Sequence, residues 1–378
     1  MTDHDAPVYA AFVSPHGFGH AARASAVLRA LHDRTGARFL LFSTVPRWFF
    51  DESLEGLYEY HEVETDVGLV QRSALEHDLD ATLEALDDFP ALTGRQVVEL
   101  AGVLEEAGAR AVLCDIAPLG IAVADHAGVP SLLLENFTWD WLYEPFHDRV
   151  PGLAEHSRLL AEWFDRAQVH LQTEPLCRLD MSADALLPPI SRPPRRDRDE
   201  VRAELGIPDD ESLVLLTMGG VGEELPFLDR LAGLDTMHVM ATGTQDTHRE
   251  GRLHCFSNET RLYLPDYVEA ADGVVAKLGY GTAAEVWAAR TPMAWVSRGD
   301  FRETEPLRRW AESELAGFEI AGDSFADGDW IDQLPELVAL THERDDAPGG
   351  ADDPDLRVET PAHMAARHLE DLAEDLTS

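Results

Sequence analysis

The sequence predicts an α/β protein built from two Rossmann-like domains. Its 378 residues exceed the length of one ordinary domain and suit two. In both halves, apolar β-branched runs alternate with segments of helical spacing, which is typical of parallel sheets covered by helices. The halves are separated by residues 186–198, LLPPISRPPRRDR, where four prolines and several arginines disfavour both helix and strand.

The first half carries five predicted buried strands and three predicted helices, and we place the first domain at residues 1–186 with a linker at 187–200. The predicted strands are residues 8–13, 38–44, 111–114, 131–134 and 169–171, and the predicted helices are residues 21–31, 80–86 and 96–106.

The second half repeats this pattern and predicts a second Rossmann-like domain over residues 201–361. A terminal helix at residues 362–378 is expected to pack back on the first domain. The predicted strands are residues 213–217, 237–242, 273–277 and 293–297, and the predicted helices are residues 227–232 and 282–289.

The net charge of −41 excludes two classes of partner. With 71 acidic residues against 30 basic ones, the surface is anionic and repels nucleic acid and acidic lipid. Salt screens such self-repulsion, so the composition favours a halophilic setting, with an ordinary acidic protein as the alternative. No oligomeric state is predicted.

Cysteine usage and hydropathy predict a cytoplasmic protein. The three cysteines are widely spaced and form neither a metal-ligand pair nor a disulfide framework, which fits a reducing compartment. The polar start at Met1–Pro7 does not resemble a signal peptide, and no apolar run approaches the roughly 18 residues of a membrane span.

The first predicted strand runs into SPHGFGHAAR, residues 14–23, a turn with candidate chemistry. Gly17 and Gly19 allow a tight turn and close approach to a ligand at the start of a helix. His16 and His20 flank the turn, and imidazole can take a proton from a hydroxyl near neutral pH. We predict His20 as a catalytic base, with a structural role for both histidines as the alternative.

A dinucleotide fingerprint is the competing interpretation of this turn. The G-x-G-x-x-G spacing requires a glycine where Ala22 stands. No acidic residue ends the second strand, which closes on Ser43 and Thr44, so a ligand for the ribose of a nicotinamide nucleotide is missing. The sequence therefore argues against a nicotinamide enzyme.

Asp115 closes the strand AVLCD and is expected beside His20, because the carboxyl ends of parallel strands meet at one edge of a sheet. A carboxylate there can fix the imidazole tautomer and stabilise its protonated form. Capping of the following helix is the alternative role.

Two strands of the second half run into glycine turns followed by helices, which suits a diphosphate because free backbone N–H groups and the helix dipole attract anions. The first turn includes Gly219 and Gly220, and the second includes Gly279, Tyr280, Gly281 and Thr282.

Three side chains near the second turn complete a candidate nucleotide site. Glu285 follows one helical turn later and could accept hydrogen bonds from a ribose. Lys277, the only lysine of the chain, and Arg298 could offset phosphate charge.

Four separated motifs resemble GT-B glycosyltransferases, and above all the amino-terminal glycosyltransferase-like part of L-arabinokinase and related stand-alone proteins. The motifs are HGFGHAAR, DVGLVQ, ENFTWDWLY and KLGYGTAAE. The resemblance covers both domains and implies an acceptor domain, a nucleotide-sugar domain and a reaction in the cleft between them. The sugar kinase that follows in arabinokinase has no counterpart before Ser378, so arabinokinase activity is not expected.

The resemblance also implies roles for individual residues. His20 matches the proposed base and Asp115 its carboxylate partner, while the turn Gly279–Thr282 matches the diphosphate site and Glu285 the ribose ligand. Leu264 belongs to a loop that meets the nucleotide base, and Arg302, Glu303 and Glu305 lie where the donor sugar is contacted. The expected acceptor side comprises His16, Gly17, Gly19, Asn136 and Trp139.

Together these observations predict transfer of a sugar from a nucleotide-diphosphate sugar, expected to be UDP-linked, to a hydroxyl of a small molecule or glycan. The sequence lacks a D-x-D pair of the kind that holds a divalent cation on the nucleotide, so no metal and no obligate cofactor are expected. The alternatives are a nucleotide-sugar epimerase or hydrolase of the same fold, and a non-catalytic protein that binds a nucleotide sugar.

Overall fold

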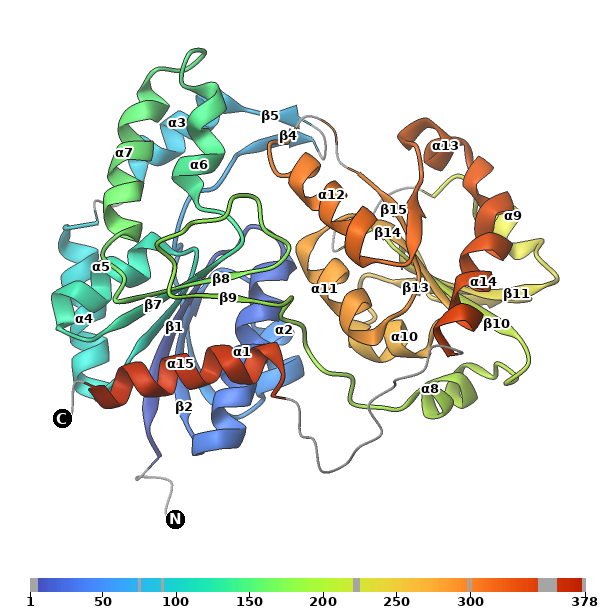
Figure 1. Cartoon of the computed structure of the whole chain (residues 1–378), viewed down its shortest axis with the longest axis horizontal. Helices are drawn as coiled ribbons and strands as arrows, with labels where there is room; N and C mark the ends of the chain where they lie inside the picture. Colours follow the sequence, from blue (N-terminus) through green and yellow to red (C-terminus); the bar gives the residue numbers. More distant parts are fainter. Residues whose placement is uncertain are drawn as a thin grey trace. The chain divides into compact units, whose positions relative to one another are not determined.

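The computed structural model describes residues 6–73, 76–89, 92–219, 225–297, 299, 301–345 and 359–375. The chain divides into two compact units, Met1–Ser191 with Glu359–Ser378, and Arg192–Val358. This division falls inside the segment 187–200 that we predicted as a linker. Each unit contains one seven-stranded sheet with helices packed on it (Figure 1).

The sheet of unit 1 has the strand order β3-β2-β1-β6-β7-β8-β9, with every neighbouring pair parallel. Because β1 lies between β2 and β6, the strand order reverses there, and ligands of such sheets bind beyond the strand ends at this switch point. The elements of unit 1 are β1 (Val8–Val13), α1 (Phe18–Thr35), β2 (Arg38–Ser43), α2 (Arg47–Leu54), β3 (Tyr58–Glu62), β4 (Gln71–Ser73), β5 (Glu76–His77), α3 (Leu79–Asp88), α4 (Arg95–Ala107), β6 (Val112–Asp115), α5 (Pro118–Ala127), β7 (Ser131–Glu135), α6 (Trp139–Tyr143), η1 (Glu144–Phe146), α7 (Gly152–Phe164), β8 (Val169–Thr173), β9 (Ala185–Leu187) and α15 (Pro361–Asp375).

The last helix, α15, belongs to unit 1 and packs beside α1 (Figure 1). Its apolar face, including Ala365 and Leu369, joins the same core as Leu28 and Leu31 of α1. At the rim of this contact, the Arg34 guanidinium pairs with the carboxylate of Glu370 at 2.7 Å. The apolar residues of α15 recur at helical spacing and form one face, and burial of this face accounts for the packing of α15 against α1.

The sheet of unit 2 has the order β12-β13-β11-β10-β14-β15-β16, and only the β12–β13 pair is antiparallel among its described pairs. The order reverses at β10 and β14, which defines a second switch point. The elements of unit 2 are α8 (Arg198–Leu205), β10 (Ser212–Thr217), α9 (Leu228–Ala232), β11 (Met237–Thr244), β12 (His248–Glu250), β13 (Leu253–Ser257), α10 (Leu264–Ala270), β14 (Gly273–Lys277), α11 (Tyr280–Ala289), β15 (Met293–Val296), α12 (Thr304–Glu314), β16 (Gly317–Glu319), α13 (Gly322–Asp327), η2 (Asp329–Gln333) and α14 (Leu334–Asp345).

Every predicted strand coincides with an observed one, but the helix starts next to the glycine turns were predicted too late. Helix α1 begins at Phe18 rather than Ala21, directly after Gly17, whose φ of 89° requires glycine. Helix α11 likewise begins at Tyr280 rather than Thr282. Gly19 and Gly281 therefore belong to the first turn of α1 and of α11, and not to the loops that precede these helices.

Some elements carry no periodic signal and were not predicted. Helix α5 is apolar and buried from Pro118 to Ala124 and polar only in its last turn, so it lacks the alternation of polar and apolar faces that marks a surface helix. Strand β3 lies at an edge of the sheet and carries charged side chains, which is typical of edge strands. Within the described ranges, no helix is long and apolar enough to cross a membrane.

Two buried histidines in unit 2 predict acid sensitivity. His238 Nδ1 lies 3.1 Å from His254 Nε2, and both side chains are almost fully buried. Burial, followed by the nearby Arg249, lowers the pKa of His238, and the same effects lower the pKa of His254 to about 4. Below pH 6.5 the unfolded chain therefore binds protons that the folded chain does not.

We expect the free energy of unfolding to fall by about 1–3 kcal/mol from this source between pH 6.5 and pH 4, and to level off below pH 4. The many carboxylates also titrate in this range. The measurement is therefore a comparison of wild type with histidine variants, in which urea unfolding at several pH values gives the free energy of unfolding of each protein. His254→Gln should show a flatter pH dependence than wild type, whereas His248→Gln, at an exposed position on β12, should not. An unchanged slope in His254→Gln contradicts the prediction.

Candidate active site

The turn between β1 and α1 brings His20 to the end of β6. Strands β1 and β6 are paired in register, with Val13 opposite Asp115. After the turn at Gly17, His20 stands in the first turn of α1, and its Nδ1 lies 2.8 Å from Oδ1 of Asp115. Asp115 is fully buried, and 9% of His20 is exposed. The predicted histidine and carboxylate thus meet at the switch point of unit 1.

Arg23 also binds Asp115, and the sequence reasoning did not single it out. Its Nε donates to Oδ2 at 2.8 Å, and one terminal nitrogen donates to Oδ1 at 2.6 Å. Residues three apart on a helix share a face, so the spacing of His20 and Arg23 was the signal that could have indicated this contact.

The charge of Asp115 depends on these neighbours. Burial by itself would raise the pKa of the Asp115 carboxyl, but the Arg23 guanidinium and the His20 ring together hold that pKa below its usual value. Asp115 is therefore ionised at neutral pH. An ionised carboxylate only accepts hydrogen bonds, so His20 carries its proton on Nδ1 and leaves Nε2 able to receive another.

His16 forms a second histidine–carboxylate pair. Its Nε2 lies 2.9 Å from Oδ1 of Asp66, a buried residue that also accepts a hydrogen bond from Ser14 Oγ at 3.3 Å. Gly68 has φ of 62°, and a Cβ there would lie 2.5 Å from the His16 ring. The edge of the ring faces Trp139, with centroids 5.1 Å apart. The structure thus brings together His16 and Trp139, two residues of the expected acceptor side.

Asn136 lies directly behind this arrangement. Its Oδ1 accepts a hydrogen bond from Arg23, and its Nδ2 donates to the carbonyls of Thr173 at 2.7 Å and Pro175 at 3.1 Å. Asn136 and Trp139 are both almost fully buried. The contacts of Asn136 connect Arg23 with the chain that leaves β8.

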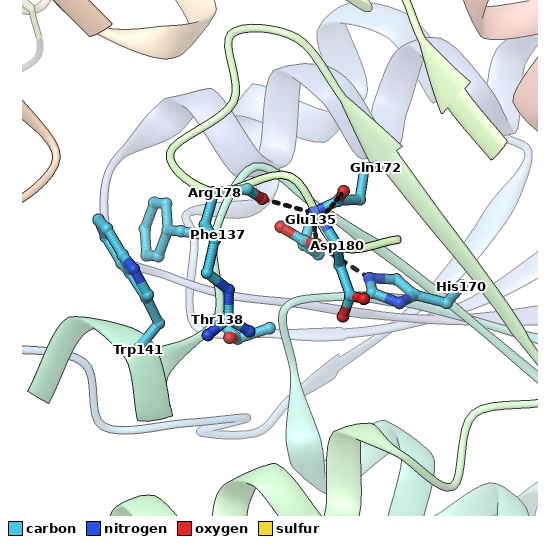
Figure 2. Close-up of a pocket in the computed structure, with 8 residues that line it drawn as sticks. All are labelled: Glu135, Phe137, Thr138, Trp141, His170, Gln172, Arg178 and Asp180. Carbon is cyan, nitrogen blue, oxygen red and sulfur yellow. Dashed lines mark hydrogen bonds and ion pairs between the residues drawn. The ribbon is translucent and has the colours of Figure 1, made fainter. Parts of the chain in front are cut away.

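A small polar cavity opens next to the end of β7 (Figure 2). Glu135 Oε1 accepts hydrogen bonds from His170 at 2.9 Å and Gln172 at 2.7 Å, while Oε2 is buried without a partner among the described residues. The cavity has a volume of about 20 Å³, which is room for about one water. Phe137 borders it and also packs edge-on against His20, with centroids 6.3 Å apart. The remaining lining residues are Thr138, Trp141, Arg178 and Asp180.

In unit 2, the ends of β10 and β14 meet at the second switch point. Gly219 has φ of 86°, and a Cβ there would lie 3.6 Å from Nζ of Lys277. Gly279 precedes α11, and Tyr280, Gly281 and Thr282 form its first turn, where backbone N–H groups have no intrahelical acceptor. Of the other predicted donor residues, Gly220 and Arg298 lie outside the described residues.

Glu285 is buried one turn further along α11, where it pairs with Arg192. Its Oε1 accepts hydrogen bonds from Arg192 at 3.2 and 3.1 Å, and both side chains are only 4% exposed. Burial raises the pKa of the Glu285 carboxyl, and the guanidinium partly offsets that rise. A role in ribose binding stays a prediction.

The other donor-side predictions fall on helix starts. Leu264 opens α10, so the segment we described as a loop is largely helical. Glu303 directly precedes α12. Within the described ranges, no three His, Cys, Asp or Glu side chains are grouped to hold a metal ion.

No known family model matches the chain. L-arabinokinase of Arabidopsis thaliana is 27% identical over 346 residues, which cover 88% of this chain and 32% of that protein. The chain therefore spans about a third of the length of the curated relative it matches.

Solved structures match the chain over nearly its whole length. Spinosyn forosaminyltransferase SpnP is 15% identical with a TM-score of 0.62, covering 98% of this chain and 100% of that one. A UDP-glucosyltransferase from Polygonum tinctorium is 13% identical with a TM-score of 0.63, covering 98% and 99%. UGT2 of Phytolacca americana, complexed with UDP-2fluoro-glucose and pterostilbene, is 14% identical with a TM-score of 0.60, covering 99% and 96%. Together with the two strand orders, these likenesses show that the chain has the GT-B glycosyltransferase fold.

Proposed function

We propose that this protein transfers a sugar from a UDP-linked sugar to a hydroxyl of a small-molecule or glycan acceptor, in a cytoplasm of high salt. The observation that carries the proposal is the His20–Asp115 pair at the switch point of unit 1. A histidine whose Nδ1 is bound by a buried carboxylate is suited to accept a proton at Nε2. The likeness to UDP-sugar-using transferases supports the choice of donor.

In the proposed reaction, His20 Nε2 takes the proton of the acceptor hydroxyl while the hydroxyl oxygen attacks the anomeric carbon of the donor sugar. The bond from that carbon to the diphosphate oxygen breaks, and the nucleoside diphosphate leaves with the electron pair. Asp115 then faces an imidazolium and stabilises it by charge. Direct displacement of this kind inverts the anomeric carbon.

The leaving diphosphate requires positive charge in unit 2, and two features supply it. The first turn of α11 offers backbone N–H groups and the positive end of the helix dipole. Lys277 adds a full charge beside Gly219, in a chain with a formal charge of −41. These groups can stabilise the leaving group without a metal or another cofactor.

Binding of a UDP-sugar is expected to protect this site from modification. Lys277 is the only lysine, so an amine acylating reagent followed by peptide mass spectrometry reports on this one side chain. UDP-glucose or UDP-N-acetylglucosamine should slow acylation and raise the melting temperature, since a ligand at 100 times its Kd adds about 2.7 kcal/mol. AMP serves as the control nucleotide.

The absence of both protection and a thermal shift with UDP-, GDP- and dTDP-sugars in molar salt would contradict the donor site. Turnover of the donor without any acceptor, by release of UDP or by conversion to another UDP-sugar, would instead favour the hydrolase or epimerase of the same fold. Binding without turnover across a panel of hydroxyl acceptors would favour a nucleotide-sugar-binding protein.

A further inference from the structure

The carboxylate of Asp115 is shared between two side chains of α1. Oδ1 accepts hydrogen bonds from His20 at 2.8 Å and from Arg23 at 2.6 Å, and Oδ2 accepts from Arg23 Nε at 2.8 Å. All three side chains are at least nine-tenths buried. This is a bidentate arginine–carboxylate pair, which fixes the plane of the carboxylate as well as its charge.

We propose that Arg23 is a positioning residue that keeps Asp115 ionised and thereby holds the His20 proton on Nδ1. The tautomer is inferred from the 2.8 Å contact of Nδ1 with the ionised carboxylate, which outweighs the longer 3.4 Å contact of Nδ1 with an Arg23 terminal nitrogen, whereas its consequence for transfer rests on the proposed function. An acid form of Asp115 would carry an O–H group that could donate to His20 Nδ1. The ring proton would then move to Nε2, which would block the nitrogen that accepts the proton of the hydroxyl.

The surroundings of Asp115 leave Arg23 as its main counter-charge. Burial of the carboxyl favours the neutral acid, and Arg23 is the stronger of the two influences that oppose this. His20 is the second, and the Cys114 thiol of β6 also lies near enough to feel the charge of Asp115. The neighbouring strand β7 is followed by the neutral amide of Asn136.

Asn136 anchors the guanidinium from the opposite side. Its Oδ1 accepts a hydrogen bond from Arg23, and its Nδ2 donates to two backbone carbonyls, one at the last residue of β8 and one just beyond it. The orientation of Arg23 is therefore set by α1 and by the segment that follows β8, so that small movements of the side chain are resisted.

The test is the tautomer of His20, read by ¹⁵N NMR of histidine-labelled protein, which needs no substrate. The His20 signals are assigned by their loss in His20→Gln. We expect protonation at Nδ1 in wild type and Arg23→Lys at pH 7.5. In Arg23→Met we expect protonation at Nε2 at this pH, with return to Nδ1 at higher pH as Asp115 ionises. Protonation at Nδ1 in Arg23→Met at every pH overturns the proposal.

Two further measurements keep the proposal testable if Arg23→Met does not fold. The ¹³C carboxyl signal of Asp115 in wild type should show the ionised form at pH 6, and a protonated Asp115 at that pH overturns the proposal. Asn136→Leu frees one side of Arg23 and should shift the His20 tautomer partly toward Nε2. No shift in this second variant would also count against the proposal.

A turnover assay separates this proposal from the proposed function. If transfer occurs, Arg23→Met should lower kcat on the order of 10²-fold, with little change in KM for the UDP-sugar and partial recovery at high pH. Arg23→Lys should retain most of the activity. If the tautomers are as expected but neither wild type nor any variant transfers a sugar, the role of Arg23 in setting the tautomer stands and the proposed transferase function is contradicted.

Discussion

His20→Ala is expected to reduce sugar transfer by about 10²–10⁴-fold, the usual contribution of a positioned general base. Binding of the UDP-sugar should remain nearly unchanged, because the predicted donor residues belong to unit 2 and His20 belongs to unit 1. The measurement combines initial rates of UDP release in the presence of acceptor with calorimetric titration of the nucleotide.

The matched control is His126→Ala, an exposed histidine in the last turn of α5. It should retain full activity and nucleotide binding. An equal loss of transfer and nucleotide binding in His20→Ala would indicate a structural role for the turn. Unchanged transfer would identify another base, and His16 with its carboxylate partner Asp66 would be the next candidate.

Glu285→Ala is expected to lower the free energy of unfolding by about 3–5 kcal/mol, the cost of removing one partner of a buried ion pair. Arg192 is 4% exposed and would keep its charge in the interior without the carboxylate of Glu285. Replacing both members, in Arg192→Met with Glu285→Leu, should restore most of this loss because no charge remains buried. Urea unfolding of the three proteins measures the difference.

The same variants test whether Glu285 also binds the ribose. If it does, the double variant should fold but bind UDP more weakly by about 1–3 kcal/mol, the cost of leaving polar groups unpaired. UDP binding equal to wild type in a stable double variant would place the ribose elsewhere. A small loss of stability in Glu285→Ala would show that Arg192 reaches another compensating group.

The sequence predicted at which strand ends the residues of the candidate site lie. His20 and Asp115 follow two buried strands, and parallel strands present their carboxyl ends at one edge, so their meeting at 2.8 Å agrees with that expectation. The closeness of Gly219 to Lys277 was not predicted, although it has the same cause, since β10 and β14 are parallel neighbours. The roles of these residues in catalysis and binding stay predictions.

The starts of the two helices that follow glycine turns were less predictable. Glycine is a poor helix former, so propensity placed the starts of α1 and α11 after the glycines of each turn. In the structure, Gly17 and Gly279 take extended or left-handed backbone conformations, and the following residues enter the helix at once. Packing of the helix on the sheet offsets the weak propensity of Gly19 and Gly281.

Sequence alone determined the two α/β domains, the buried strands and which residues stand at their ends, because side-chain periodicity and glycine turns are local properties. Tertiary structure decided which charges are paired. Arg23 with Asp115 and Arg192 with Glu285 are separated by 92 and 93 residues. Such pairs depend on strand order and on how each helix rotates over its sheet, and both are set by burial of apolar area across the whole unit rather than by any local pattern.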